Sequence, residues 1–102
     1  MNQDVQAKFE QLDAAFDAFT GWINNDGALS YKTKTLISLA IAVAKGCDSC
    51  VRSQTMKCIE LGASDEEIIE ACFVAVKMDG GPSAGRTKNW VLELLKDKQE
   101  GG

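Results

Sequence analysis

The stretch that decides the fold covers residues 36–50 and reads LISLAIAVAKGCDSC. Its first part, Leu36–Ala44, is apolar on nearly every face of a helix, which predicts a central helix buried on all sides. Gly46 is expected to end that helix, because glycine readily adopts the backbone conformation that closes a helix. A new helix is expected to start at once, with Cys47 and Cys50 in its first turn, three residues apart.

The rest of the chain also divides into helices separated by turn residues. Apolar residues recur at steps of three and four from Val5 to Ile23, which predicts one apolar stripe along a helix. No segment alternates apolar and polar residues with β-branched enrichment, so no strand is expected and the fold class is all-α. Five helices are expected: residues 3–24, 31–45 with Ser30 as N-cap, the cysteine pair to about Leu61, a helix from a capping box at 64–67 through Val76 to a break at 80–82, and about 84–97.

Length and composition predict one folded domain over residues 1–102. Hydrophobic residues make up 45% and charged residues 25% of the chain, which is typical of a globular protein. The last residues, 99–102, are polar and end in glycine, so this tail is expected to fray.

The charge pattern and the apolar runs exclude several classes of protein. Eleven basic residues against fifteen acidic ones give a net charge of −4 without a basic cluster, which argues against a nucleic-acid partner. The longest apolar run, 39–44, is far shorter than the roughly 20 residues that span a membrane. The first residues lack the apolar block of a secretion signal. A cytoplasmic location is therefore expected, where thiols are normally reduced.

Cys47 and Cys50 are the candidate catalytic residues. The positive end of a helix favours an anion, so it lowers the pKa of a thiol and raises the fraction of reactive thiolate. Two thiols one turn apart can also close into a disulfide and reopen. Lys45 and Arg52 are near enough in sequence to add cationic support. This chemistry needs no cofactor, and none is expected.

A metal centre is an alternative interpretation, because the same cysteine spacing supplies half of many zinc sites. Cys58 follows Cys47 by eleven residues, which is about 16 Å along one helix, so the two cannot share an ion within the chain. Cys72 could approach from the next helix, but the chain has no histidine to complete the ligand set. No metal ligand is therefore predicted, and Cys58 and Cys72 are interpreted as small buried hydrophobic residues.

Four segments in the same order carry a family resemblance: 29–37, 46–50, 61–68 and 80–82. Together they make the stretch 29–83 similar to the carboxymuconolactone decarboxylase and alkylhydroperoxidase-D-like family. The resemblance implies an all-α helical bundle of the alkylhydroperoxidase-D type, assembled into trimers or hexamers. It also implies a Cys-x-x-Cys pair that reduces peroxides or exchanges disulfides with a redox partner protein.

The chain departs from the redox-active members of that family at two positions. Those members carry a Glu twelve residues before the first cysteine and a His four residues after the second, and these groups relay protons to and from the thiols. Here the corresponding residues are Thr35 and Gln54, and neither titrates near neutral pH. General acid–base groups contribute roughly 10²–10⁴-fold, so peroxidase turnover is expected to be weak. Decarboxylation is the least expected enzyme activity, because the chain has few acids that could protonate the carbanion.

The sequence therefore predicts a thiol–disulfide oxidoreductase with peroxidase activity as a second reaction of the same pair. Cys47 is expected to attack the substrate disulfide and Cys50 to resolve the product, and the reverse order stays open. The alternative is a non-catalytic helical scaffold or binding subunit. The stripe that holds Phe9, Phe16 and Phe19 predicts a homo-oligomer, because one small domain would otherwise expose it.

Overall fold

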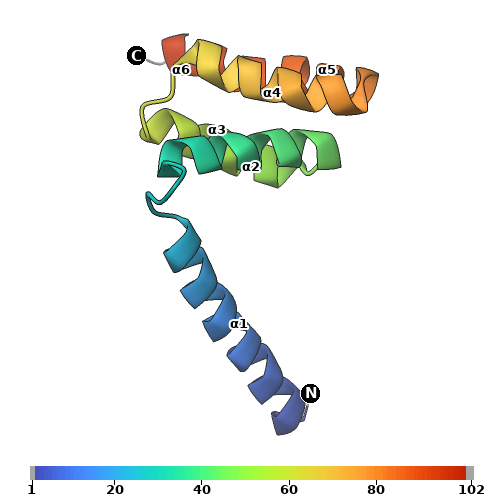
Figure 1. Ribbon diagram of the computed structural model, residues 1–102. Coiled ribbons are helices and arrows are strands. Elements are labelled where there is room, and N and C mark those ends of the chain that lie inside the picture. Colours follow the sequence, from blue (N-terminus) through green and yellow to red (C-terminus); the bar gives the residue numbers. More distant parts are fainter. Residues whose placement is uncertain (1, 101–102) are drawn as a thin grey trace. The chain divides into compact units, whose positions relative to one another are not determined.

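The structure is a computed structural model that describes residues 2–100 of the chain (Figure 1). The described residues form helices joined by turns, and no strand occurs among them, which confirms the all-α prediction. The contacts divide the chain into two compact units, one up to Tyr31 and one from Lys32 onward. Each unit is described by itself below. The prediction of a single domain over 1–102 stays a prediction.

The first unit is a long helix followed by a turn. Helix α1 spans Gln3–Ile23. The side chain of Asn2 caps its start, since Asn2 Oδ1 accepts a hydrogen bond from the backbone N–H of Val5 at 2.9 Å. The helix ends where the sequence predicts, and the N–H of Asn24 donates to the carbonyl of Thr20 at 2.9 Å. None of the residues of α1 is buried, so this unit has no hydrophobic core of its own.

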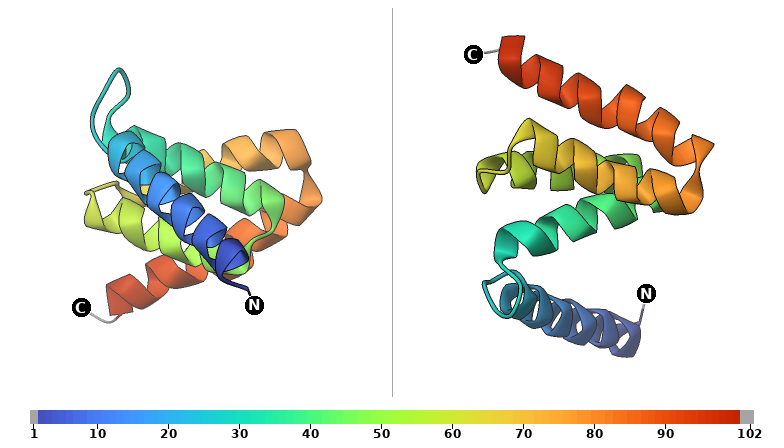
Figure 2. Two further views of the ribbon diagram at one scale, coloured as in Figure 1. Left: turned by 90° about the horizontal axis from the view of Figure 1, so that it is seen from below. Right: turned by 45° about the horizontal axis from the view of Figure 1, so that its top comes forward.

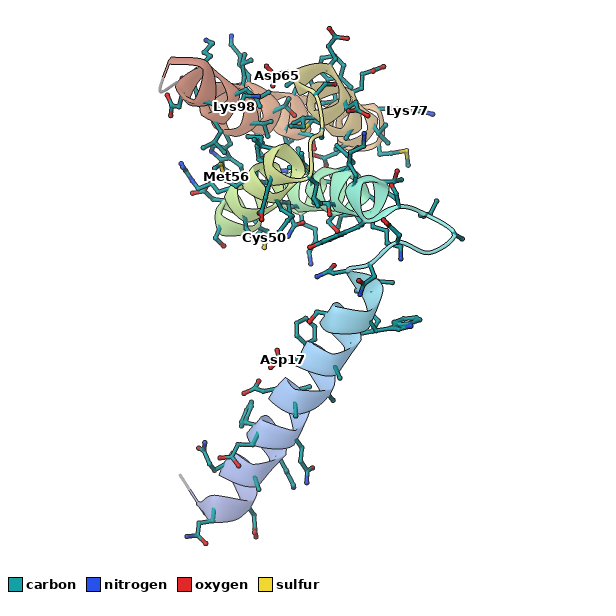
Figure 3. The ribbon with its side chains drawn as sticks, turned by 90° about the vertical axis from the view of Figure 1, so that its left-hand side faces the viewer. Asp17, Cys50, Met56, Asp65, Lys77 and Lys98 are labelled. Atoms are coloured by element: carbon teal, nitrogen blue, oxygen red, sulfur yellow. The ribbon has the colours of Figure 1, made fainter. Side chains whose placement is uncertain are left out.

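The second unit carries the remaining helices. In Figure 1, α4 and the run from α5 to α6 lie above α2 and α3, and Figure 2 shows the same elements from two other sides. The contact of Lys98 Nζ with Asp65 Oδ1, at 2.6 Å, ties the last helix to the start of α4 (Figure 3). The elements are α2 (Tyr31–Lys45), α3 (Asp48–Glu60), α4 (Asp65–Asp79), α5 (Gly81–Arg86), the π-helical turn η1 (Thr87–Val91) and α6 (Leu92–Glu100).

The core of the second unit is built from small and medium apolar side chains. Cys58 and Cys72 are both fully buried in it, which confirms their interpretation as core residues. The prediction that Leu36–Ala44 is buried on all sides is wrong, because Ile37 and Ile41 are 45% and 55% exposed. The other helices of the unit leave that face of α2 uncovered. The core consists of Leu39, Ala42, Val43, Val51, Cys58, Ala63, Ile68, Cys72, Ala75, Val91 and Leu95.

The last helical run begins earlier than the predicted start at residue 84. Gly80 makes the break with a φ of +82°, and α5 starts at Gly81. Pro82 lies in the first turn, where its missing N–H leaves no hydrogen bond unmade. The run extends beyond the predicted end at 97 to Glu100, while 101–102, the end of the tail that is expected to fray, lie outside the described residues.

One turn of this run is wider than an α-helix. In η1 the N–H of Leu92 donates to the carbonyl of Thr87, five residues earlier. Among residues 2–100, no helix combines the length and the apolar character that crossing a membrane requires.

The predicted capping box at the start of α4 is present. Ser64 Oγ accepts from the N–H of Glu67 at 3.0 Å, and Glu67 Oε1 accepts from the N–H of Ser64 at 2.9 Å. Lys32 Nζ also lies 3.1 Å from Glu67 Oε2. The backbone hydrogen bond from Ser64, and then the Lys32 ammonium, lower the pKa of the Glu67 carboxyl.

We expect Ser64→Ala to lower the free energy of unfolding by about 1 kcal/mol, because it leaves the Glu67 N–H without its side-chain acceptor. Urea denaturation measures the change. The control is Ser53→Ala, at an exposed serine inside α3, which should leave stability nearly unchanged. Equal losses in the two variants would contradict a capping role for Ser64.

Candidate functional site

The cysteine pair lies at the junction of α2 and α3. Gly46 ends α2 with a φ of +76°, and its N–H donates to the carbonyl of Ala42 at 3.0 Å. Cys47 is the N-cap residue of α3, and its Sγ accepts the backbone N–H of Cys50 at 3.4 Å. The predicted helix start at the glycine–cysteine junction is therefore confirmed. Both cysteines are free thiols: Cys47 is half-buried, and Cys50, labelled in Figure 3, is exposed.

Hydrogen bonds push the pKa values of the two thiols in opposite directions. The Cys50 side chain, then the Ser49 hydroxyl at 3.6 Å from Cys47 Sγ, then the Cys50 backbone N–H lower the pKa of Cys47, and the charge of Lys45 adds to this. The same hydrogen bond with Cys47, followed by desolvation, raises the pKa of Cys50. Of the two thiols, Cys47 is therefore the more acidic.

A cavity of about 290 Å³ opens beside the pair. It brings together three of the residues that the sequence singles out, namely Cys47, Cys50 and Gln54. The fourth, Thr35, does not line the cavity and is buried in α2 with 3% of its surface exposed. The cavity is lined by Ser38, Ile41, Ala42, Lys45, Cys47, Cys50 and Gln54.

The lining supplies a narrow set of chemical groups. None of the lining residues is a carboxylate or an imidazole, so the cavity holds two thiols, one ammonium, one amide and one hydroxyl. Within the described part of the chain, no group of three or more His, Cys, Asp or Glu residues is arranged to hold a metal ion. The arrangement can form and break S–S bonds, but its lining offers neither a carboxylate nor an imidazole to relay a proton.

A larger hollow of about 690 Å³ lies between α4 and α6, and no cysteine lines it. Its floor is apolar, with Ile69, Leu92 and Leu95, and its remaining lining is one lysine and the carboxylates of Asp65, Glu66 and Glu70. The smaller cavity is therefore the candidate functional site, because it holds the thiols.

Arg86 contacts the end of α2, and the sequence analysis does not identify it. Its Nη1 donates to the carbonyl of Val43 at 2.9 Å and to that of Ala44 at 3.2 Å. These carbonyls belong to the last turn of α2, and that of Val43 also accepts the N–H of Gly46 at 3.2 Å. A Cβ atom on Gly46 would lie 2.9 Å from Arg86 Cζ, so the guanidinium packs directly against the residue before Cys47.

Asp79 holds Arg86 in this position. The Asp79 carboxylate lies 3.6 Å from Arg86 Nη1 and accepts a hydrogen bond from Ser83 Oγ at 2.6 Å. The sequence signal that could have pointed to these residues is an acidic residue directly before the Gly80 break and an arginine directly after the first turn of the next helix.

The comparisons with known proteins agree with this fold. The model of the carboxymuconolactone decarboxylase family matches residues 8–93. The chain belongs to this family. This match confirms the resemblance that the four sequence motifs carry.

Relatives and solved structures of this family match most of the chain. An uncharacterised protein of Cupriavidus necator is 36% identical over 82% of this chain and 77% of its own length. Uncharacterised protein 4 in the cox locus of Paracoccus denitrificans is 37% identical over 84% of this chain and 77% of its own.

Two crystal structures of carboxymuconolactone decarboxylase family proteins share the fold. The Legionella pneumophila protein has a TM-score of 0.79 and 32% identity, over 91% of this chain and 83% of that one. The Thermotoga maritima protein, for which a part in the antioxidative response is suggested, has a TM-score of 0.71 and 31% identity, over 100% of both chains.

We expect Arg86→Met to lower the free energy of unfolding by about 1.5–3 kcal/mol, because it keeps the length of the side chain and removes charged hydrogen bonds to α2. The matched control is Arg52→Met: the side chain of Arg52 is 58% exposed and pairs with Asp48 on the surface, so a loss of about 0–1 kcal/mol is expected. Urea denaturation compares the two. A loss at Arg86 no larger than at Arg52 would contradict the supporting role.

Alkylation should separate the four cysteines. At pH 7.5 in the folded protein, iodoacetamide is expected to react first at Cys47, because its pKa is lowered. Cys58 and Cys72 should react only after unfolding, because burial raises the pKa of each thiol to about 11. Peptide mass spectrometry as a function of pH gives the rates. Modification of Cys58 or Cys72 at the rate of Cys47 would contradict this arrangement.

Proposed function

We propose that this family member is a thiol–disulfide oxidoreductase that works through Cys47 and Cys50. The observation that carries the proposal is the capping contact at the start of α3, where Cys47 Sγ accepts the Cys50 N–H at 3.4 Å. A sulfur in that position is stabilised as a thiolate by backbone N–H groups and by the helix dipole. The adjoining cavity offers room for part of a substrate at the same sulfur.

The first step is attack of the Cys47 thiolate on one sulfur of a substrate disulfide. An S–S bond forms between Cys47 and that sulfur, and the other substrate sulfur leaves as a thiolate. Cys50 then gives its proton to the released thiolate and attacks the Cys47 sulfur, which expels the second substrate sulfur as a thiolate. The substrate is reduced by two electrons, and the two cysteines are oxidised to a disulfide. A dithiol of a redox partner protein restores the pair by the reverse exchange.

We propose peroxide reduction as a slower reaction of the same pair. The Cys47 thiolate would attack one peroxide oxygen, become a sulfenic acid and release an alkoxide, and Cys50 would then condense with the sulfenic acid to form the disulfide and water. The alkoxide needs a proton, and Gln54 can donate a hydrogen bond but not a proton at neutral pH. The suggested antioxidative part of the Thermotoga maritima relative supports this second reaction.

The rival function is a non-catalytic helical scaffold. It is favoured by the lack of a carboxylate or an imidazole among the residues that line the cysteine cavity. We prefer exchange chemistry because attack on a disulfide needs a thiolate and a good leaving thiol more than it needs a proton relay. The proposed setting is the cytoplasm, where a partner dithiol keeps the pair reduced.

We expect Cys50→Ser to accumulate a mixed disulfide with glutathione when the purified protein is given glutathione disulfide. Cys47→Ser should accumulate it more slowly, because the thiol that remains, Cys50, is not the N-cap residue and lacks the backbone N–H contact that stabilises a thiolate at Cys47. Intact-mass measurement counts the adducts. A Cys72→Ala control removes a buried thiol and should exchange like the parent chain.

The order of attack and the function are contradicted by different results. Faster trapping in Cys47→Ser than in Cys50→Ser would reverse the assigned roles of the two cysteines. Full disulfide reductase activity in the double variant Cys47→Ser with Cys50→Ser, measured with a dithiol reductant, would overturn the proposed function.

A further inference from the structure

Among the described residues that line the cavity beside the cysteine pair, Lys45 is the one with a fixed charge. It is the last residue of α2, its side chain is exposed, and only Gly46 separates it from Cys47. Its positive charge is close enough to both cysteine sulfurs to favour their thiolate forms, which adds to the hydrogen bonds described above. The ammonium therefore lies where the substrate of the thiols must enter.

The Lys45 ammonium has no counter-ion from its own chain. Other basic side chains of the second unit pair with carboxylates, such as Lys32 with Glu67 at 3.1 Å. Within residues 2–100, the Lys45 side chain makes neither an ion pair nor a hydrogen bond. Unpaired lysines are ordinary on a protein surface, but this one lines the cavity that holds the thiols, so its charge is free to bind a ligand there.

The other charges close to the thiols cancel each other. Asp48 lies next to Cys47 in the first turn of α3, and its Oδ1 accepts a hydrogen bond from Arg52 Nε at 3.1 Å. None of the residues that line the cavity carries a carboxylate. The electrostatic potential in the cavity is therefore set by Lys45, and it favours an anion over a cation.

The remaining lining suits a short carbon chain with a polar end. Ile41 and Ala42 provide apolar surface, and the side-chain amide of Gln54, which makes no hydrogen bond within the described part of the chain, provides a second donor. A carboxylate can accept from an ammonium and from an amide at the same time. The volume of about 290 Å³ lies near the lower end of small-molecule sites, which measure roughly 300–1,000 Å³.

We propose that the substrate of this site is a small organic disulfide with a carboxylate near its sulfur, and that Lys45 selects it by pairing with that carboxylate. The inference rests on the proposed function and names its substrate class. The Cys47 thiolate forms an S–S bond with one half of the substrate, and the other half leaves as a thiolate that keeps its own carboxylate. The ammonium also offsets the charge of the Cys47 thiolate, which alone would repel an anionic substrate.

Three disulfides of similar size and different charge test the selection: dithiodipropionate is an anion, hydroxyethyl disulfide is neutral, and cystamine is a cation. Each is given in excess to the reduced parent chain, and intact mass after alkylation follows the oxidation of Cys47 and Cys50. Each rate is divided by the rate of the same disulfide with mercaptoethanol, a neutral thiol, which removes differences between the leaving groups. We expect the anion to have the highest normalised rate and the cation the lowest, and the order to disappear near about 1 M salt, where the Debye length is about 3 Å.

Lys45→Met should lower the ratio of the normalised anion rate to the cation rate by roughly three- to tenfold, because one exposed charge pair is lost. Lys45→Glu should reverse the order of the two charged probes. Any change in the thiolate fraction affects all three probes alike, so it cancels in the ratio. A lysine that only stabilised the end of α2 would leave the ratio unchanged.

The matched control is Lys57→Met, which removes the same charge from an exposed ion pair with Glu60. Lys57 follows Cys47 by ten residues along α3, which is about 15 Å, and it does not line the cavity. This variant should keep the parental order of the three probes.

Equal normalised rates for the three probes in the parent chain, or the same ratio in the parent chain and in Lys45→Met, would overturn the selection and leave the proposed function standing. Failure of the proposed function has a different signature, since none of the three disulfides would then oxidise the cysteine pair, and that result would overturn both.

Discussion

The guanidinium of Arg86 donates hydrogen bonds to two carbonyl groups in the last turn of α2. Because Asp79 holds the guanidinium in place, α2 can stop within one residue and turn through Gly46 at a φ of +76°. That abrupt stop puts Cys47 at the N-cap of α3. The position of the thiolate, and with it the proposed chemistry, depends on a contact made by a residue far along the chain.

The same site favours one reaction over another. In the proposed function, the Cys47 sulfur that accepts a backbone N–H attacks the substrate disulfide, and Cys50, one turn away, resolves the product. The cavity beside them replaces the family's proton-relay side chain with Gln54, and Thr35 is buried away from it. Disulfide exchange tolerates these replacements better than peroxide reduction, because a thiolate leaves more readily than an alkoxide.

Local sequence signals predicted the parts of the fold that depend on neighbouring residues. The glycine–cysteine junction and the Ser64 capping box are set by residues within one turn of each other, so both were found. The Arg86 contact joins residues 43 positions apart, and no local pattern contains it. The apolar run Leu36–Ala44 predicts a helix buried on all sides, but Ile37 and Ile41 are exposed. The reason is related: periodicity identifies an apolar face, but it does not tell which other element covers that face.

The π turn Thr87–Val91 lies between two parts of one helical run that make different contacts. Before it, Arg86 must reach the end of α2, and after it, Val91 and Leu95 must fill the core. A π turn closes with an i→i+5 hydrogen bond in place of i→i+4, so it changes the direction in which the side chains after it point. Without the bulge, an α-helix that kept Arg86 against the end of α2 would turn Val91 and Leu95 toward other faces of the helix.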